Sequence, residues 1–139
     1  MSKASENLEQ AQRKAMQVRP KVGGFPVLAG VLRQAGVQRN LRYLPSAQSV
    51  YLTEFGPVVT LGQPLMTGTL DVPAFDQEAL VRALRKDQAG ETSLPEFLLA
   101  SWDAGVVSYD VDLEACTVTY YGVGDEVYTE TYDAAAVPA

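Results

Sequence analysis

Residues 93–113, SLPEFLLASWDAGVVSYDVDL, decide the fold because they contain a helix start, a helix stop and a strand in direct succession. Ser93 and Glu96 have the Ser-x-x-Glu spacing of a capping box, and Pro95 stands in the first turn, where its missing N–H is harmless. Gly105 is suited to the position just after such a helix, where the backbone commonly takes the left-handed conformation that ends it. Apolar and polar residues then alternate, which predicts a strand with one face toward a core.

The same plan occurs earlier in the chain, with Pro26 lying 69 residues before Pro95. Without gaps, residues 26–60 and 95–129 are identical at eight of 35 positions, where sequences of this composition would share about two by chance. The identical residues are Pro26, Ala35, Gly36, Val37, Leu44, Tyr51, Val58 and Thr60 in the first half, and Pro95, Ala104, Gly105, Val106, Leu113, Tyr120, Val127 and Thr129 in the second. This repeat predicts two similar units packed on each other, with any groove between them.

Each unit is predicted to follow the order helix, helix, strand, strand, strand. The first unit, about 5–61, has expected helices at 5–18 and 25–35 and expected strands at 39–44, 48–54 and 57–61. A connector at 62–74, with an extended piece at 66–70, leads to the second unit, about 75–132, with helices at 76–88 and 93–105 and strands at 106–113, 116–121 and 126–132. Asp76 is expected to cap the third helix.

These elements predict one α+β domain over residues 1–139, with helices packed on antiparallel sheet and the units related by a pseudo-twofold axis. Residues 133–139 are expected to form a flexible tail. The gapless comparison aligns Leu41 with Asp110, which reverses the faces of the strand and predicts a bulge or an insertion near residues 38–45 in one copy.

The composition favours one domain with its own core, because 139 residues are 47% hydrophobic and 20% charged. Apolar runs fall well short of the roughly 20 residues of a membrane span, so no membrane association is expected. Residues 1–6 lead into a charged amphipathic stretch rather than an apolar secretory segment. Together with the single Cys116, which has no internal disulfide partner, this predicts a cytoplasmic protein.

The charges are divided between the two halves of the chain. Residues 1–42 hold eight Lys or Arg against Glu6 and Glu9, whereas residues 87–139 hold eleven Asp or Glu and no basic residue. Either the two units complement each other across a shared surface, or the basic half presents a face to an anionic partner. The net charge of −6 argues against general nucleic-acid binding, where positive charge dominates affinity.

The chain has no histidine, which removes the commonest general base, the usual zinc ligand and the Ser-His and Cys-His nucleophile pairs. Gly122–Asp125 is predicted to be a hairpin turn rather than a phosphate loop, and Cys116, at the start of a strand, a half-buried structural residue. No catalytic residue and no cofactor is therefore assigned. A carboxylate-based enzyme stays an alternative, with Glu54, Asp87, Asp110 and Asp112 as candidates.

Asp110, Asp112 and Glu114 stand at alternate positions, so a strand would present all three carboxylates on one face, where they could collect calcium or magnesium. The spacing does not match a calcium loop, because Ala115 and Tyr121 occupy the glycine and glutamate positions of that loop. A solvated polar face of an antiparallel strand explains the same alternation. We therefore expect no metal site here and retain the three residues as candidates.

All seven tyrosines fall in predicted strands, where they suit a sheet that is apolar on one side and wet on the other. Ordinary packing explains them, and the alternative is an aromatic surface that binds a partner or a small ligand. The residues of this candidate binding surface are Tyr51, Trp102, Tyr109, Tyr120 and Tyr121. Basic residues near the helix ends of the first unit, namely Arg19, Lys21, Arg39 and Arg42, are either scattered solvated charges or an anion site.

Two stretches, residues 104–112 (AGVVSYDVD) and 117–122 (TVTYYG), resemble an uncharacterised bacterial family known as domain of unknown function 1398. The resemblance extends upstream through residues 84–90 and Pro95-Glu96-Phe97 and, more weakly, through the first unit from Gly24. Some members of that family carry the label phage envelope protein. Many members have a histidine before a Gln-x-Gly sequence, whereas this chain has Asp87 before Gln88-Ala89-Gly90, so no role of that histidine carries over.

Taken together, these features predict a small non-catalytic binding or regulatory protein of unknown ligand. A homodimer or another protein partner is one expectation, because a regulatory module needs a surface to act through. A small-molecule binder with a pocket between the two units is the alternative. The carboxylate-based enzyme is the third hypothesis.

Overall fold

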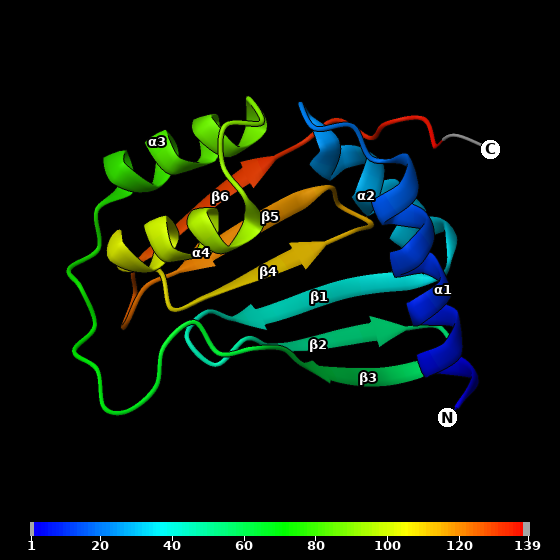
Figure 1. The fold of residues 1–139 in the computed structure, drawn as a ribbon, viewed down its shortest axis with the longest axis horizontal. Helices are drawn as coiled ribbons and strands as arrows, with labels where there is room; N and C mark the ends of the chain where they lie inside the picture. The colour runs from blue at the N-terminus through cyan, green and yellow to red at the C-terminus, as the bar shows by residue number, and fades with distance from the viewer. Residues whose placement is uncertain (1, 138–139) are drawn as a thin grey trace.

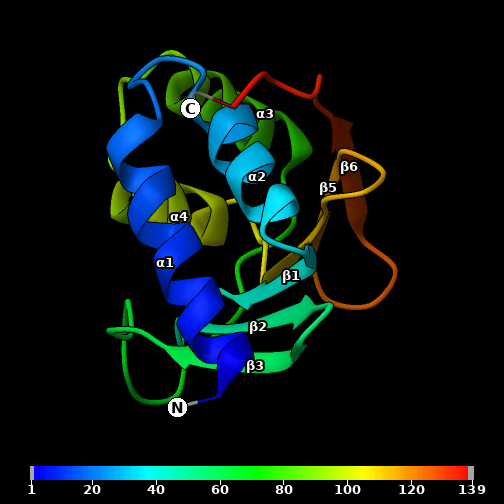
Figure 2. The same ribbon diagram turned by 90° about the vertical axis from the view of Figure 1, so that its right-hand side faces the viewer.

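The computed structural model describes residues 2–137 of the chain. Its helices are α1 (Lys3–Val18), α2 (Gly24–Gln34), α3 (Gln77–Gln88) and α4 (Leu94–Asp103), and its strands are β1 (Val37–Tyr43), β2 (Gln48–Thr53), β3 (Gly56–Leu61), β4 (Ser108–Asp112), β5 (Thr117–Tyr121) and β6 (Val127–Thr131). The four helices lie in front of one antiparallel sheet, which is an α+β fold (Figure 1). None of these helices covers the opposite face of the sheet (Figure 2).

The sheet has the strand order β3-β2-β1-β4-β5-β6, so each half of the chain forms one half of the sheet. The halves meet where β1 pairs with β4, from Arg39 opposite Asp112 to Tyr43 opposite Ser108. This central pairing brings residues about 70 positions apart in the sequence into direct contact, as in the pair of Arg42 and Tyr109.

The register divides the strand residues between two faces, because side chains that are paired across strands project to the same side. One row on the helix-facing side consists of Ser49, Arg42, Tyr109, Tyr120 and Tyr128. The next row consists of Tyr51, Asn40, Val111, Val118 and Glu130. These two rows form the floor on which the helices pack.

The core lies between the helices and this floor. Its most deeply buried large side chains are Leu8, Leu44, Leu80, Leu98 and Leu113, each 1% exposed or less. Complete burial of such a side chain contributes about 1.5–3 kcal/mol, so these contacts hold the helix layer on the sheet. In the part of the chain that the structure describes, no helix is both long enough and apolar enough to cross a membrane.

The expected helix ends are confirmed. Ser93 and Glu96 form both hydrogen bonds of the capping box, and the side chain of Asp76 accepts a hydrogen bond from the backbone N–H of Ala79. Gly36 and Gly105 follow the C-terminal ends of α2 and α4 with φ angles of 90° and 88°, in the conformation that favours glycine.

Two local predictions are wrong. Cys116 does not begin a strand, since it lies in the turn before Thr117 with a φ of 57°. The expected extended piece at 66–70 is not a strand, because Gly68 has a φ of 94° and interrupts an extended backbone. The predicted irregularity near residues 38–45 is confirmed at the start of that interval, where the β1–β2 register shifts between Val37 and Arg39.

Backbone conformations recur at the spacing of the predicted repeat. Besides Gly36 and Gly105, Ala47 and Cys116 both have positive φ angles, of 61° and 57°, in the turns that follow β1 and β4. The repeat of two units and the pseudo-twofold axis between them both stay predictions. Residues 133–137 form no helix or strand, and residues 138–139 of the predicted tail lie outside the described residues.

Candidate functional site

A pocket of about 330 Å³ lies between the helix layer and the floor of the sheet. Both halves of the chain line it, which is where the sequence leads us to expect a groove. The apolar walls come from α2, α3 and α4, and their residues are Phe25, Pro26, Leu28, Leu32, Leu84 and Phe97. Exposed lining residues, among them Arg19, Lys21 and Leu94, place the pocket in contact with solvent.

The two halves of the chain are joined at the rim of this pocket. The backbone N–H of Gly23, before α2, donates a hydrogen bond of 3.0 Å to the carbonyl of Gln88 at the end of α3. The ring of Phe25 meets the ring of Tyr132, which follows β6, edge-on with 5.1 Å between centroids. These contacts fix the start of α2 relative to the end of α3 and to the second half of the sheet.

Three tyrosines of the predicted binding surface lie on the pocket floor, namely Tyr51, Tyr109 and Tyr120. The rings of Tyr109 and Tyr120 are 5.8 Å apart between centroids. Burial raises the pKa of Tyr109 to about 12, although the nearby charge of Arg42 acts to lower it. Burial also raises the pKa of Tyr120. Both phenols therefore stay protonated at neutral pH and remain hydrogen-bond donors.

Polar atoms without partners are concentrated at the β1 part of the floor. Asn40 and Arg42 both line the pocket, and neither Oδ1 of Asn40 nor Nε of Arg42 has a hydrogen-bond partner. Oγ of Ser49, which lies opposite Arg42 in the β1–β2 ladder, is also buried without a partner. A buried polar atom left unpaired costs about 1–3 kcal/mol, so three neighbouring ones require an explanation.

The two carboxylates that line the pocket differ in their surroundings. Burial raises the pKa of Asp87, while the hydroxyl of Thr92, which donates a hydrogen bond of 3.3 Å, and the charge of Arg19 act in the opposite direction. Burial also acts to raise the pKa of Glu130, but hydrogen bonds from Arg85 and Tyr128 outweigh it and lower the pKa. The Arg85–Glu130 ion pair has an N–O distance of 2.8 Å.

The candidate metal residues lie outside this pocket, on the opposite side of the sheet or in the turn after β4. Asp110 is buried and forms an ion pair with Arg39, across the β1–β4 junction. One carboxylate oxygen of Asp112 accepts hydrogen bonds from the backbone N–H groups of Glu114 and Ala115, and Glu114 itself is exposed. Within residues 2–137, no group of three or more such side chains is placed to hold a metal ion.

The remaining predicted surface residues are dispersed. Trp102 is buried among the helices of the core and does not line the pocket, and Tyr121 is 40% exposed on the opposite side of the sheet from Tyr120. Of the four carboxylates considered for catalysis, Asp87 lines the pocket, whereas Asp110 and Asp112 do not. The structure therefore does not bring those carboxylates together.

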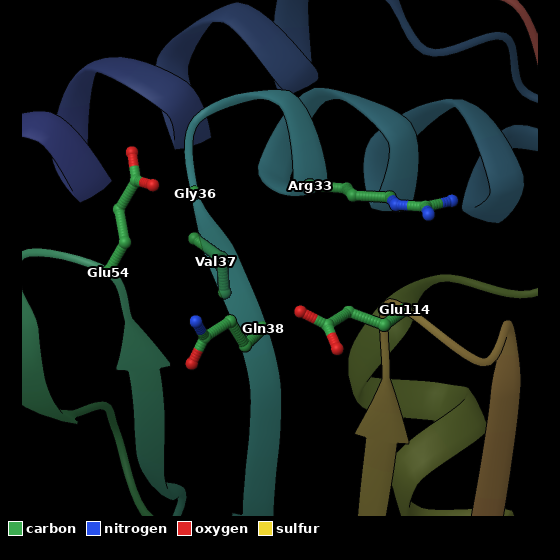
Figure 3. A pocket seen from close by; sticks show the side chains of 6 residues that line it. All are labelled: Arg33, Gly36, Val37, Gln38, Glu54 and Glu114. Atoms are coloured by element: carbon green, nitrogen blue, oxygen red, sulfur yellow. The ribbon is translucent and has the colours of Figure 1, made fainter.

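Glu54 lines a second hollow, of about 360 Å³, beside the start of β1. Its residues are Arg33, Gly36, Val37, Gln38, Glu54 and Glu114 (Figure 3). All but Gly36 and Val37 are exposed. The side chain of Arg33 extends away from Glu54 rather than toward it (Figure 3). This arrangement is that of solvated surface charges, and it lacks the apolar walls of the first pocket.

Sequence reasoning missed several residues of the pocket, notably Asn40, Phe25 and Glu130. A signal was present for Asn40, because it stands two positions before Arg42 on β1 and therefore shares its face. No comparable signal exists for Phe25, whose position over the second half of the sheet depends on tertiary packing. Of the basic residues singled out, Arg19, Lys21 and Arg42 line the pocket, and Arg39 does not.

Comparisons with known proteins give a family but no activity. The chain is 54% identical over 134 residues to "Uncharacterized protein Rv2012" of Mycobacterium tuberculosis (strain ATCC 25618 / H37Rv), a match that covers 96% of this chain and 82% of that protein. It is equally similar to "Uncharacterized protein Mb2035" of Mycobacterium bovis, with the same identity and coverage. The profile of the family described as "Protein of unknown function (DUF1398)" matches residues 12–131. Since that match spans most of the fold, including the three helices that form the pocket walls, the chain belongs to this family of proteins of unknown function.

Proposed function

We propose that this protein binds a small organic molecule, without catalysis, in the pocket between α2, α3, α4 and the sheet. The observation that carries the proposal is the combination of apolar walls with unpartnered polar atoms on the floor. Of the expected binding surface, the proposed site keeps Tyr51, Tyr109 and Tyr120. It adds Asn40 and Arg42, which line the same pocket.

The size and lining of the pocket support this function. Small-molecule sites have volumes of about 300–1,000 Å³, mostly apolar walls and a few convergent polar groups, and a pocket of about 330 Å³ is at the lower end of that range. Cavities that stay empty in protein interiors are apolar, whereas polar ones hold water or another hydrogen-bonding occupant. Here the floor carries an amide, a guanidinium and three phenols, which favours an occupant that makes hydrogen bonds.

The absence of paired catalytic groups in the pocket supports binding rather than chemistry. Glu130 accepts hydrogen bonds from Arg85, Tyr128 and Gln88 and is ion-paired with Arg85. Among the described residues, Asp87 is then the one carboxylate of the pocket lining that forms no ion pair. A cytoplasmic location is part of the proposal, supported by Cys116, the single cysteine of the sequence, which has no disulfide partner within the chain.

The test is a search for a bound compound. Protein purified from cells is first weighed intact by native mass spectrometry, and the stripped protein is then screened against a metabolite library by thermal denaturation. A ligand present at about 100 times its Kd stabilises the folded protein by about 2.7 kcal/mol, which shifts Tm by several degrees. We expect a retained compound, a set of stabilising compounds, or both.

Two variants show whether the compound occupies this pocket. Leu28→Trp places a larger side chain into the pocket wall and should abolish the shift in Tm, whereas Val59→Trp, at a 55% exposed position on the uncovered side of the sheet, should retain it. If Leu28→Trp binds the compound as well as wild type does, the compound occupies a different site. If no compound is retained and none stabilises the protein, the proposed function is wrong.

A further inference from the structure

The guanidinium of Arg42 is a half-buried cation without a carboxylate partner. Among the described residues, the ion pairs are Arg39–Asp110 and Arg85–Glu130, and Arg42 belongs to neither. Its direct neighbours in the ladders are Ser49 and Tyr109, which carry hydroxyls and no charge at neutral pH. A cation taken partly out of water is costly unless an anion or several acceptors compensate it.

The pocket's own acids do not supply that anion. Glu130 accepts hydrogen bonds from Arg85 and Tyr128, which occupy both of its carboxylate oxygens. Asp87 accepts a hydrogen bond from Thr92, and the positive charge that lowers its pKa is that of Arg19, not that of Arg42. Arg42 therefore keeps its charge available toward the pocket.

Neutral donors and acceptors surround this available charge. Arg42 lies directly opposite Tyr109 in the β1–β4 ladder, and Tyr51 of β2 lines the same pocket. Asn40, only 9% exposed, lines the same pocket and has an unpartnered side-chain oxygen. The planar guanidinium and the phenol beside it suit a carboxylate, which accepts two parallel hydrogen bonds from arginine and further ones from phenols, whereas the oxygen of Asn40 suits a donor group elsewhere on the ligand.

The rest of the pocket is suited to an uncharged, apolar part of a ligand. The walls opposite the floor are formed by Phe25, Leu28, Leu84 and Phe97, which offer aromatic and aliphatic contacts and no charge. Burial of an apolar group against these walls contributes about 25 cal/mol for each Å² removed from water. A molecule that is polar at one end and apolar at the other thus matches both parts of the pocket.

From this arrangement we infer that the ligand is a small organic carboxylate with an apolar or aromatic body, its carboxylate bound by Arg42 and Tyr109. The inference rests on the proposed function and names the ligand class of that same pocket. Arg42 supplies the charge, and Tyr109 donates a hydrogen bond to the carboxylate. Arg19 and Lys21, at the solvent-exposed part of the lining, add positive charge that attracts an anion toward the pocket.

Matched probes test the class of head group. Benzoate, 3-phenylpropanoate, indole-3-acetate and octanoate are titrated by calorimetry, each beside the alcohol and the amine with the same body. We expect at least one carboxylate to bind, and to bind at least about tenfold more tightly than its alcohol and its amine. Equal binding of alcohol and acid would overturn the inference and leave the proposed function standing, because a neutral ligand would still occupy the pocket.

Variants test the role of Arg42 in that binding. Arg42→Gln should weaken binding of the carboxylate at least about tenfold, and Tyr109→Phe should weaken it by a smaller factor. Arg33→Gln, which removes the same charge at an exposed position outside this pocket, is the control and should change nothing. Thermal denaturation shows first that each variant is folded, and Tyr109→Phe still tests the site if Arg42→Gln is not.

Three further results would count against the inference. A carboxylate that binds Arg42→Gln and wild type equally is not held by Arg42, and the inference is then wrong. If no carboxylate binds while other library compounds do, the ligand class is wrong and the pocket function remains. If nothing binds at all and no compound is retained from cells, both proposals fail together.

Discussion

Arg42 and Tyr109 lie directly opposite each other where β1 pairs with β4, and the charge of Arg42 opposes the effect of burial on the pKa of Tyr109. Burial is the stronger influence, because the pKa of Tyr109 rises from 10.0 to about 12. The junction of the two halves of the chain therefore presents one permanent cation and one protonated phenol to the pocket. This pair gives the first two predictions.

The free energy of unfolding of the protein should decrease between pH 10 and about pH 12. The pKa of Tyr109 is higher in the folded protein than in the unfolded chain, so its contribution is complete below pH 10.0 and is lost as the pH rises through about 12. Burial raises the pKa of Tyr132 to about 12 as well, which adds to the effect. Urea unfolding at a series of pH values measures the decrease. Tyr109→Phe should make it shallower, and a decrease identical to that of wild type would contradict the assignment to Tyr109.

Loss of Arg42 should raise the pKa of Tyr109 further, because the positive charge that favours the phenolate is removed. The ultraviolet absorbance of tyrosinate, followed in Arg42→Gln and in wild type, measures the change as a later alkaline step. Arg13→Gln, which removes an exposed cation of α1, serves as the control and should leave the tyrosinate titration unaltered. An alkaline step in Arg42→Gln at the same pH as in wild type would show that the charge of Arg42 does not act on Tyr109.

Gly105→Ala should be more destabilising than Gly36→Ala, although the two glycines have nearly the same φ. A Cβ at Gly105 would lie 2.6 Å from the backbone Cα of Phe75, whereas a Cβ at Gly36 would lie 2.6 Å from Cγ of the exposed Glu54, which is free to move. We expect costs of about 3 kcal/mol and about 1–2 kcal/mol, respectively. Chemical denaturation measures both, and equal costs would contradict the backbone contact at Phe75.

Ser93→Ala should destabilise the protein by about 1 kcal/mol, because the hydroxyl of Ser93 accepts a hydrogen bond from the backbone N–H of Glu96 at the start of α4. Glu96→Ala should also be destabilising, since its carboxylate accepts a hydrogen bond of 2.8 Å from the N–H of Ser93. Ser46→Ala, at an exposed turn position, is the matched control. A loss no larger than that of Ser46→Ala would show that the cap does not limit stability.

The sequence predicts the parts of this fold that depend on neighbouring residues. Helix starts at Asp76 and Ser93 and helix ends at Gly36 and Gly105 are local events, decided within about four residues by capping groups and by the conformational freedom of glycine. The prediction of an extended piece at 66–70 is wrong for an equally local reason, because Gly68 takes a φ of 94° in the middle of it.

The pocket depends instead on pairings that local patterns do not contain. Alternation shows that Tyr120 and Tyr121 lie on opposite faces, so at most one of the two belongs to a given surface, but it does not show which. That choice is made by the helices, which pack on the side of Tyr120 and leave Tyr121 40% exposed. The central pairing of β1 with β4 then places Arg42 beside Tyr109. The position of Phe25 above Tyr132 follows from the packing of α2 across both halves of the chain.

The two pocket carboxylates should have opposite effects on stability as the pH falls. Burial raises the pKa of Asp87 above 3.8, so at neutral pH its charge is unfavourable, and Asp87→Asn should be more stable than wild type. This advantage should disappear in acid, where Asp87 is protonated in both states. Glu130 behaves in the reverse sense, because hydrogen bonds from Arg85 and Tyr128 outweigh burial and hold its pKa below 4.5.

Glu130→Gln should therefore be less stable than wild type above pH 4.5, and the difference should be lost as the pH falls through the lowered pKa of Glu130. Unfolding curves of both variants between neutral and acid pH measure these slopes, and Glu126→Gln, at an exposed position before β6, is the control. Side-chain carboxyl chemical shifts give the two pKa values independently. Parallel stability profiles for Asp87→Asn and Glu130→Gln would contradict the contacts of Glu130 with Arg85 and Tyr128, because these contacts separate the behaviour of the two half-buried acids.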